Sequence, residues 1–392
     1  MVATPAAPPS AASRPAVSDR HRLQAAQLDV PTRLLLGPGP SNAHPRVLQA
    51  LGMRQVGHLD PAFIGLMNET QELLRYVWQT DNQVTIPVSG TGSAAMEATL
   101  ANTVEPGDKV LIGVNGYFGL RLTDMAERYG AEVVQIHKPW GEVFSLDELR
   151  AAVEEHRPAI LALVHAETST GACQPFEGVG DLCREFNCLL LADTVTSIGG
   201  VPLFVDEWGI DMVYAGGQKA LSCPPGIAPL SFSDRALEKL NARKSKVPNW
   251  YLDLSLVGKY WGSERTYHHT APINMNYAMR ECLRLVAEEG LEERWARHQA
   301  TGELLWDGLA DMGIECHVAK EFRLPTLTTV KIPEGVDGKA VCKQLLSEYN
   351  IEIGGGLGEL GGKVWRVGLM GHNSRPETVL TLLAALKKVL GK

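Results

Sequence analysis

Short runs of apolar and β-branched residues alternate with helix-like patterns through the middle of the chain. Seven such runs have the length and composition of strands: residues 84–88, 109–114, 132–136, 159–165, 188–192, 212–215 and 228–232. Apolar residues recur at helical spacing between the first five runs, over residues 93–103, 119–129, 146–156 and 178–186. Strands that alternate with helices are typical of a parallel sheet wound with helices through right-handed crossovers. The pattern predicts an α/β fold with a mainly parallel, seven-stranded sheet.

A second group of elements follows towards the C-terminus. It contains expected helices at residues 276–290, 292–312, 338–349 and 376–390 and expected strands at residues 326–331, 351–354 and 364–367. These elements predict a smaller α+β domain over residues 276–392, which follows a large domain over residues 31–275.

The beginning of the chain has a different composition. From Met1 to Ser18 it is rich in Ala, Pro and Ser and has no acidic residue, so it cannot build a core. An organellar transit peptide has a similar composition, but this segment lacks a clear amphipathic period. We therefore expect residues 1–30 to form a disordered tail of a cytoplasmic protein, with organellar targeting as the alternative.

Charge and cysteine content narrow the class of partner. The net charge is -8 and 21% of the residues are charged, so no basic surface is expected for nucleic acid or an anionic membrane. The apolar runs are far shorter than the ~18 residues that span a bilayer. Several of the seven cysteines lie in predicted strands and helices, and none forms a C-x-x-C pair, which indicates reduced thiols in a cytosolic protein. Small-molecule chemistry is the favoured class of function.

The candidate chemistry centres on Lys219 and Asp193. Lys219 closes the motif G-G-Q-K, and Asp193 follows the apolar run 188–192 at the carboxyl end of a predicted buried strand. Enzymes that use pyridoxal phosphate (PLP) need a lysine that holds the cofactor as a Schiff base and an acid that keeps the pyridine nitrogen protonated. Either residue alone would suit a surface lysine or a loop aspartate. Together with the motifs below, they favour PLP.

A glycine-rich loop supplies the next element of the predicted site. The motif G-T-G-S at residues 90–93 follows a strand and opens a helix, where backbone N–H groups bind phosphate. With the alanines that follow, it also matches the G-x-G-x-x-A dinucleotide motif. That motif requires an acid after the next strand, yet Asp108 precedes residues 109–114 and no acid follows them closely. The loop therefore favours a PLP phosphate over NAD, with a structural tight turn as the alternative.

Two more motifs lie at the same edge of the predicted sheet. Thr168 belongs to the motif E-T-S-T-G, which follows the strand 159–165 and places hydroxyl groups within reach of a cofactor oxygen. Phe118 follows the strand 109–114, where its ring could stack on a pyridine. In isolation, a threonine such as Thr168 more often caps a turn, and a phenylalanine such as Phe118 more often belongs to the core than stacks on a cofactor.

Taken together, these motifs resemble a known family. They are G-P-G-P-S-N at residues 37–42, S-G-T-G at 89–92, E-T-S-T-G at 167–171, Asp193, G-Q-K-A at 217–220, Y-H-H-T at 267–270 and K-V-W-R-V-G at 363–368. Over residues 30–392 the chain resembles the alanine:glyoxylate and serine:pyruvate aminotransferases of class V. The resemblance implies the fold-type I architecture of PLP-dependent transferases and a homodimer with shared active sites.

The resemblance also implies the residues of the site. Those expected around PLP are Thr91, Gly92, Ser93, Phe118, Thr168, Asp193, Gln218, Lys219, Tyr267 and Thr270. Among them, Lys219 would bind the cofactor covalently, Asp193 would pair with the pyridine nitrogen, and Tyr267 and Thr270 would come from the other subunit.

The resemblance assigns the substrate carboxylate to Arg366, with Ser41 and Asn42 beside it. A guanidinium group suits this task because it can bind a carboxylate through two parallel hydrogen bonds.

Two positions depart from the animal members of the family. Phe118 stands where a tryptophan commonly stacks on the ring, and Ser93 stands where a histidine often follows the glycine pair. The ring of Phe118 can still stack on the cofactor. Because Ser93 replaces that histidine, the substrate preferences of the animal enzymes, including that for hydroxykynurenine, are not carried over to this chain. His268 and His269 could suggest a metal, but adjacent histidines of a strand point to opposite faces, so no metal site is expected.

We therefore expect a PLP-dependent aminotransferase that moves the amino group of alanine or serine to glyoxylate in two half-reactions, with Lys219 as general base. Serine as donor and pyruvate as acceptor stay open. A desulfurase or β-lyase of the same fold would need a cysteine on a mobile loop, and no cysteine lies in an obvious exposed Gly- or Ser-rich loop of the small domain. A non-catalytic PLP-binding protein would not need Lys219, Asp193 and Arg366 together.

Overall fold

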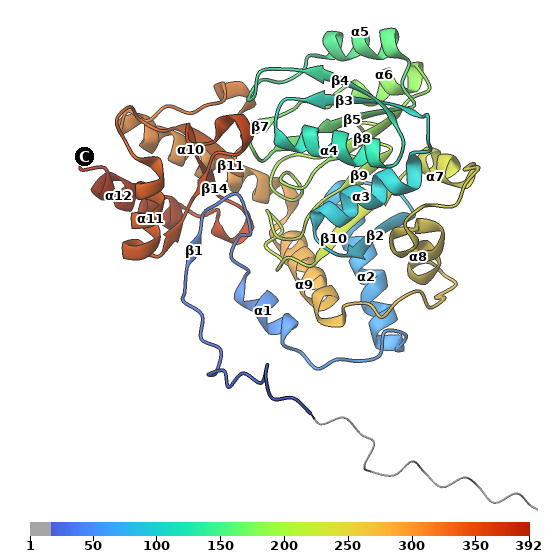
Figure 1. The fold of residues 1–392 in the computed structure, drawn as a ribbon, viewed down its shortest axis with the longest axis horizontal. Helices are drawn as coiled ribbons and strands as arrows, with labels where there is room; N and C mark the ends of the chain where they lie inside the picture. The colour runs from blue at the N-terminus through green and yellow to red at the C-terminus, as the bar shows by residue number, and fades with distance from the viewer. Residues whose placement is uncertain (1–16) are drawn as a thin grey trace, which may run out of the picture. The chain divides into compact units, whose positions relative to one another are not determined.

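A computed structural model describes residues 17–392 of the chain. Residues 33–392 form one compact unit, which contains a seven-stranded sheet and a smaller three-stranded sheet (Figure 1). Residues 17–32 contain neither helix nor strand. The rest of the predicted disordered tail, residues 1–16, lies outside the described residues.

The large sheet has the strand order β2-β10-β9-β8-β5-β3-β4. Its strands are β2 (Val84–Ser89), β3 (Lys109–Val114), β4 (Glu132–His137), β5 (Ile160–Val164), β8 (Leu189–Asp193), β9 (Met212–Tyr214) and β10 (Ile227–Phe232). Only β10 is antiparallel to its neighbours, so the mainly parallel seven-stranded sheet is confirmed. The carboxyl ends of the other strands therefore meet at one edge, where open α/β sheets bind their ligands.

Helices cover both faces of this sheet (Figure 1). One face carries α3 (Gly92–Thr103), α4 (Tyr117–Arg128), α7 (Asp234–Asn241) and α8 (Leu254–Trp261), and the other carries α5 (Leu146–His156), α6 (Val179–Glu185) and α9 (Ile273–Glu289). Successive residues of a strand point to opposite faces. Accordingly, Val110 and Ile112 join the first core, whereas Leu111 joins the second. Burial on both faces explains why the strands are almost uninterrupted apolar runs.

Two helices near the N-terminus are absent from the sequence-based prediction: α1 (Pro45–Leu51) and α2 (Pro61–Trp78). Asp60 caps α2 by accepting the N–H of Ala62, and a proline occupies its first turn. The helix buries Phe63, Met67, Leu74 and Trp78 on one side. The signal for α2 is therefore present in the sequence as an Asp-Pro pair followed by apolar residues at helical spacing.

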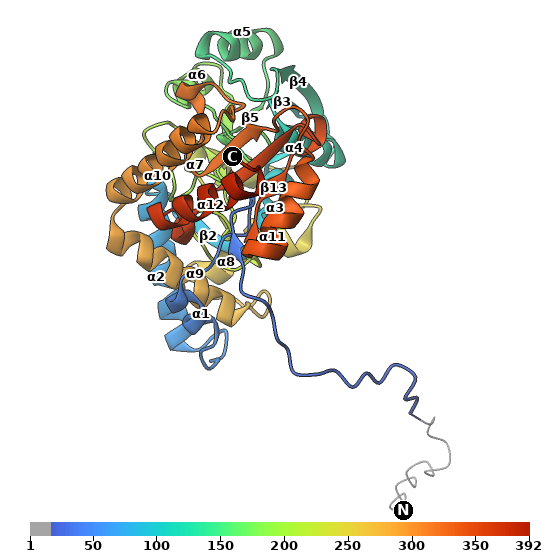
Figure 2. The ribbon, with the colours of Figure 1, turned by 90° about the vertical axis from the view of Figure 1, so that its left-hand side faces the viewer.

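The second sheet comprises β11 (Leu327–Lys331), β14 (Val364–Gly368) and β13 (Gly354–Gly355), with β14 in the centre and antiparallel to both neighbours. It shares a core with α10 (Leu291–Asp311), α11 (Gly338–Tyr349) and α12 (Pro376–Val389), which face the viewer in Figure 2. The expected smaller α+β region is thus present. At its border, β1 (Leu34–Leu35) pairs in parallel with β12 (Ile351–Glu352). The predicted domain boundary after residue 275 stays a prediction.

Two global features bear on the chemistry. All seven cysteines lie within residues 17–392 and carry free thiols, most of them buried. Among the helices in this range, none combines the length and apolarity that a membrane span requires.

Candidate active site

Asp193 and Lys219 meet at the carboxyl edge of the large sheet. Asp193 is the last residue of β8 and is 2% exposed, and Lys219, in the loop between β9 and β10, is 8% exposed. Burial and, after it, the charge of Arg366 lower the pKa of the Lys219 amine, while the charge of Asp193 raises it, and the net pKa is about 8. An amine with this pKa is partly neutral near pH 7, so it can act as a nucleophile or a base.

The carboxylate of Asp193 is held by two hydrogen bonds. The N–H of Val195 donates to Oδ1 at 2.9 Å, and the hydroxyl of Tyr214 donates to Oδ2 at 2.8 Å. Burial raises the pKa of Asp193 to about 6, whereas these hydrogen bonds and the charge of Lys219 lower it. The group is therefore a fixed, ionised acid above about pH 6. Tyr214 is not among the predicted site residues, although it is the residue that pairs in register with Asp193 on the neighbouring strand.

The start of α3 fits a phosphate group. Within the described chain, its N-cap residue Thr91 makes no side-chain cap, and the N–H of Ala94 donates to the Thr91 carbonyl oxygen at 2.7 Å, so the N–H groups of Gly92 and Ser93 are left for another acceptor. Gly92 lies beside Gly216: a Cβ atom on Gly92 would be in ordinary van der Waals contact with the Cα of Gly216, at 3.5 Å. The buried Oε1 of Gln218 has no hydrogen-bond partner among residues 17–392, which leaves this side-chain amide free to turn a donor towards an anion.

Thr168 and Phe118 lie at the same sheet edge. Thr168 connects β6 (Ala166–Glu167) to β7 (Ala172–Cys173), and its hydroxyl contacts that of Thr196 at 2.5 Å. Phe118 lies in the first turn of α4 and is partly exposed. The guanidinium of Arg121 lies 4.7 Å from the centre of the Phe118 ring and donates to Ser93 Oγ at 3.2 Å. Arg121 is not among the predicted site residues, although the spacing of three residues puts both side chains on one helix face.

Arg366 points from β14 towards this edge. Its Nε donates to the carbonyl oxygen of Gly355 at 2.8 Å, and Nη1 donates to the carbonyl oxygen of Thr168 at 3.2 Å. Burial lowers the pKa of this guanidinium, which nevertheless stays charged. The side chain therefore offers a positioned cation with part of its donor fork uncommitted.

The side chains of Ser41 and Asn42 mainly bond to backbone groups, Ser41 to the loop of Lys219 and Asn42 to residues just before it in the chain. The Ser41 hydroxyl donates to the carbonyl oxygen of Lys219 at 2.8 Å. Asn42 Oδ1 accepts the N–H of Leu35 at 2.9 Å, while its Nδ2 donates to the carbonyl oxygen of Arg33 at 2.9 Å. Their predicted role in binding the substrate carboxylate stays a prediction, with the side chain of Asn42 already committed.

The motif at residues 267–270 differs from its expected conformation. It lies in a loop rather than a strand, and the Nδ1 atoms of His268 and His269 contact each other at 2.8 Å, so the expectation of opposite faces was wrong. No group of three potential metal ligands is found in residues 17–392. The side chains of Tyr267 and Thr270 are exposed, with Tyr267 57% exposed, and their role at a second subunit's site stays a prediction.

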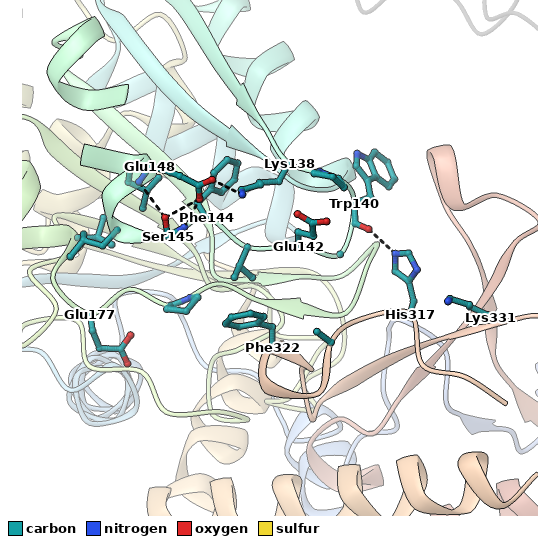
Figure 3. A pocket seen from close by; sticks show the side chains of 18 residues that line it. Lys138, Trp140, Glu142, Phe144, Ser145, Glu148, Glu177, His317, Phe322 and Lys331 are labelled. Carbon is teal, nitrogen blue, oxygen red and sulfur yellow. Dashed lines mark hydrogen bonds and ion pairs between the residues drawn. The ribbon is translucent and has the colours of Figure 1, made fainter. Parts of the chain in front are cut away.

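A spacious cavity lies elsewhere on the molecule. It has a volume of about 1090 Å³ and is lined by the loop after β4 together with residues of the C-terminal region (Figure 3). Lys138 and Glu148 form an ion pair of 2.5 Å there, and His317 Nε2 contacts the carbonyl oxygen of Trp140 at 2.7 Å. None of the predicted site residues lines this cavity. The candidate active site is therefore placed at the buried Lys219 and not at this cavity.

Comparisons with known proteins match almost the whole chain. The family model described as aminotransferase class-V matches residues 40–367. An alanine–glyoxylate aminotransferase of Mus musculus is 44% identical over 387 residues, which cover 98% of this chain and 91% of that protein. A (S)-ureidoglycine–glyoxylate transaminase of Bacillus subtilis is 41% identical over 382 residues, with 93% of this chain and 92% of that protein covered.

A solved structure agrees with the fold. The crystal structure of an alanine–glyoxylate aminotransferase from Nostoc sp. is 69% identical in sequence and has a TM-score of 0.95. The match covers 96% of this chain and 100% of that chain.

Proposed function

The chain belongs to the class V aminotransferases and is a transaminase; from that premise we propose that it moves the amino group of a small L-amino acid, alanine or serine, to glyoxylate with PLP as cofactor. The observation that carries the proposal is the buried pair of Lys219 and Asp193 at the carboxyl edge of the sheet, with Arg366 beside it. A desulfurase is not favoured, since the structure of a cysteine desulfurase from Thermococcus onnurineus is 14% identical and supports the fold alone.

The residues around Lys219 fit PLP. Its phosphate would be held by the start of α3 at Thr91 and Gly92, with the free amide of Gln218 and, by the resemblance, Ser93 nearby. When bound, PLP supplies a carbonyl carbon that carries the amino group and a ring that delocalises the electron pair of the substrate Cα. Asp193 would hold a proton at the ring nitrogen, because an ionised carboxylate in a buried site favours a protonated partner.

Lys219 is proposed to hold the cofactor and then to move the proton of the substrate. Its pKa of about 8 leaves about a tenth of the amine neutral at pH 7, which suits a general base. The same burial keeps water away from Nζ, so the proton moves between the amine and the substrate Cα rather than to solvent. Thr168 would hold the cofactor ring from the side, and Phe118 would stack on its face.

Arg366 is proposed to bind the substrate carboxylate. Its Nη2 has no hydrogen-bond partner among residues 17–392, and two of its N–H groups are already anchored to backbone carbonyls. Anchoring fixes the plane of the guanidinium, so the substrate meets a preorganised cation.

Glyoxylate as acceptor is supported by two kinds of relative. The proteins of Mus musculus and Bacillus subtilis are named for different donors, alanine and (S)-ureidoglycine, but share glyoxylate. The ureidoglycine relative makes that compound a third candidate donor, beside alanine and serine. We also propose a homodimer in which Tyr267 and Thr270 complete the site of the other subunit, in keeping with their exposure in one chain.

A half-reaction assay tests this proposal. The PLP-loaded protein is mixed with one donor at a time, without acceptor, and the keto product is measured by mass spectrometry. We expect about one equivalent of product per chain from alanine, serine or ureidoglycine, and turnover only after glyoxylate is added. Lys219→Ala is the control and should form no product. Absence of product from the unaltered protein with every donor would refute the proposal.

A further inference from the structure

Glu167 is a buried carboxylate that the proposed reaction does not use. It is the second residue of β6 and is 0% exposed. Its Oε1 accepts the N–H of Ser169 at 2.9 Å and the hydroxyl of Ser169 at 2.6 Å, and its Oε2 accepts the N–H of Phe118 at 3.1 Å. All these groups are donors, so they stabilise the ionised form. Burial acts in the opposite direction and raises the pKa of Glu167 to about 7.

These bonds tie the β6–β7 hairpin to the start of α4. The first N–H groups of a helix have no partner within the helix. In α4, the N–H of Tyr117 donates to Ser169 Oγ at 2.9 Å and the N–H of Phe118 donates to Glu167. The N-cap itself is Gly116, which has no side chain for this task. A carboxylate from another element therefore caps the helix, at the end where its dipole favours negative charge.

The fit around Gly116 is tight. A Cβ atom on Gly116 would lie 2.3 Å from Cδ of Glu167 and 2.7 Å from Ser169 Oγ. The φ angle of 179° is accessible to any residue, so the glycine is required for space rather than for conformation. The backbone before α4 and the carboxylate are thus fitted to each other.

Resting on the proposed function, in which Phe118 stacks on the cofactor ring, we propose that Glu167 is a positioning residue that sets the plane of Phe118 by capping α4. Phe118, whose ring would stack on the cofactor, itself donates its N–H to Glu167. Arg121, against the Phe118 ring, moves with the same helix. Thr168 follows Glu167 directly, so one carboxylate links two predicted contacts of the cofactor.

Glu167→Gln tests this role because the amide keeps the shape of the carboxylate but turns a donor towards at least one of its donor partners. At pH 8 we expect a folded protein whose dissociation constant for PLP rises about tenfold. The visible circular dichroism of bound PLP should change, since this signal reports the asymmetric surroundings of the ring. Gly116→Ala should cause the same spectral change with the carboxylate intact, because the new methyl group displaces it.

Asp211 provides a matched control. It is a buried acid, 3% exposed, that accepts the N–H of Leu190 at 2.9 Å and the hydroxyl of Ser233 at 3.0 Å, at the amino end of β9. Asp211→Asn should lower the stability of the protein but leave its PLP affinity and circular dichroism unchanged. Comparing Asp211→Asn with Glu167→Gln separates the general loss of stability on altering a buried acid from a specific effect on the position of the Phe118 ring.

A double-mutant cycle with Phe118→Leu tests whether Glu167 affects PLP binding through Phe118. If Glu167 acts through Phe118, Glu167→Gln should change PLP affinity less than twofold in the Phe118→Leu background. A full effect in that background would overturn the inference, as would unchanged affinity and circular dichroism in Glu167→Gln alone. Failure of the unaltered protein to bind PLP would instead refute the proposed function, so the two failures are distinguishable.

Discussion

Tyr214→Phe is the sharpest single test of how the site holds its acid. The change removes the hydroxyl that donates to Asp193 Oδ2 at 2.8 Å and leaves the rest of the buried ring in place. A hydrogen bond to a charged group contributes about 1.5–3 kcal/mol, and one pKa unit corresponds to about 1.4 kcal/mol. The pKa of Asp193, about 6 in the unaltered protein, should therefore rise by about one to two units.

The sign of the pH dependence follows from this shift. The folded pKa of Asp193 already lies above the ordinary value of 3.8, so ionisation costs folded-state stability as the pH rises through about 6. In Tyr214→Phe this loss continues to about pH 7–8. The free energy of unfolding of the variant should therefore fall below that of the unaltered protein by more at pH 9 than at pH 5. At pH 7 the ionised fraction should drop from about nine-tenths to between one half and one tenth.

If PLP binding needs the ionised carboxylate, its affinity at pH 7 should fall about 2- to 9-fold in Tyr214→Phe. Urea unfolding of the cofactor-free protein and equilibrium dialysis of PLP measure the two quantities. Tyr129→Phe is the matched control, because the Tyr129 hydroxyl donates to Glu97 at 2.8 Å outside the site. An unchanged affinity, or a stability difference that does not grow between pH 5 and pH 9, would refute the role assigned to Tyr214.

Three further predictions concern stability, substrate binding and assembly. Burial lowers the pKa of His298 to about 3, so between about pH 6.5 and pH 3 this histidine binds a proton only in the unfolded chain. The free energy of unfolding should therefore fall by about 2 kcal/mol between pH 8 and pH 5 because of this histidine. Urea titrations of His298→Gln should show a smaller fall. An equal fall in both proteins would contradict this. Arg366→Lys should raise the apparent KM for the amino acid about tenfold with little change in PLP binding, because an ammonium cannot form a bidentate pair; an unchanged KM would indicate another carboxylate site. Heterodimers of a Lys219→Ala chain and a Tyr267→Phe, Thr270→Ala chain should regain about half of the normal activity per dimer at limiting PLP, whereas no recovery would mean that both residues serve their own chain.

Much of the large sheet was predictable because its strands are buried on both faces. Residues 109–114 and 146–156 were predicted with their observed bounds, since an apolar run marks β3 and a capping box between Ser145 and Glu148 marks the start of α5. The predicted strand 351–354 was too long, because Gly354 leaves the pairing with β1 and joins the other sheet as β13. Local patterns do not specify which partner a short glycine-containing strand takes.

The candidate site was predictable only in part. Lys219 and Asp193 follow recognisable local motifs, and the structure brings them to one sheet edge. Tyr214 and Glu167 make contacts between elements that are distant in the chain, such as the bond from Phe118 to Glu167, and Arg121 does so through its bond to Ser93. A sequence motif shows that such a residue is present, but its partner becomes known only when the helix and the hairpin are packed together.

The most direct test of the central claim is to trap the cofactor on its lysine. The PLP-loaded protein is reduced with borohydride and digested, and the modified peptide is identified by mass spectrometry. We predict one label per chain, on Lys219, that disappears when an accepted amino donor such as alanine or serine is added before reduction and returns when glyoxylate follows. A label on another lysine, or a label on Lys219 that neither the donor nor glyoxylate changes, would contradict the proposed chemistry.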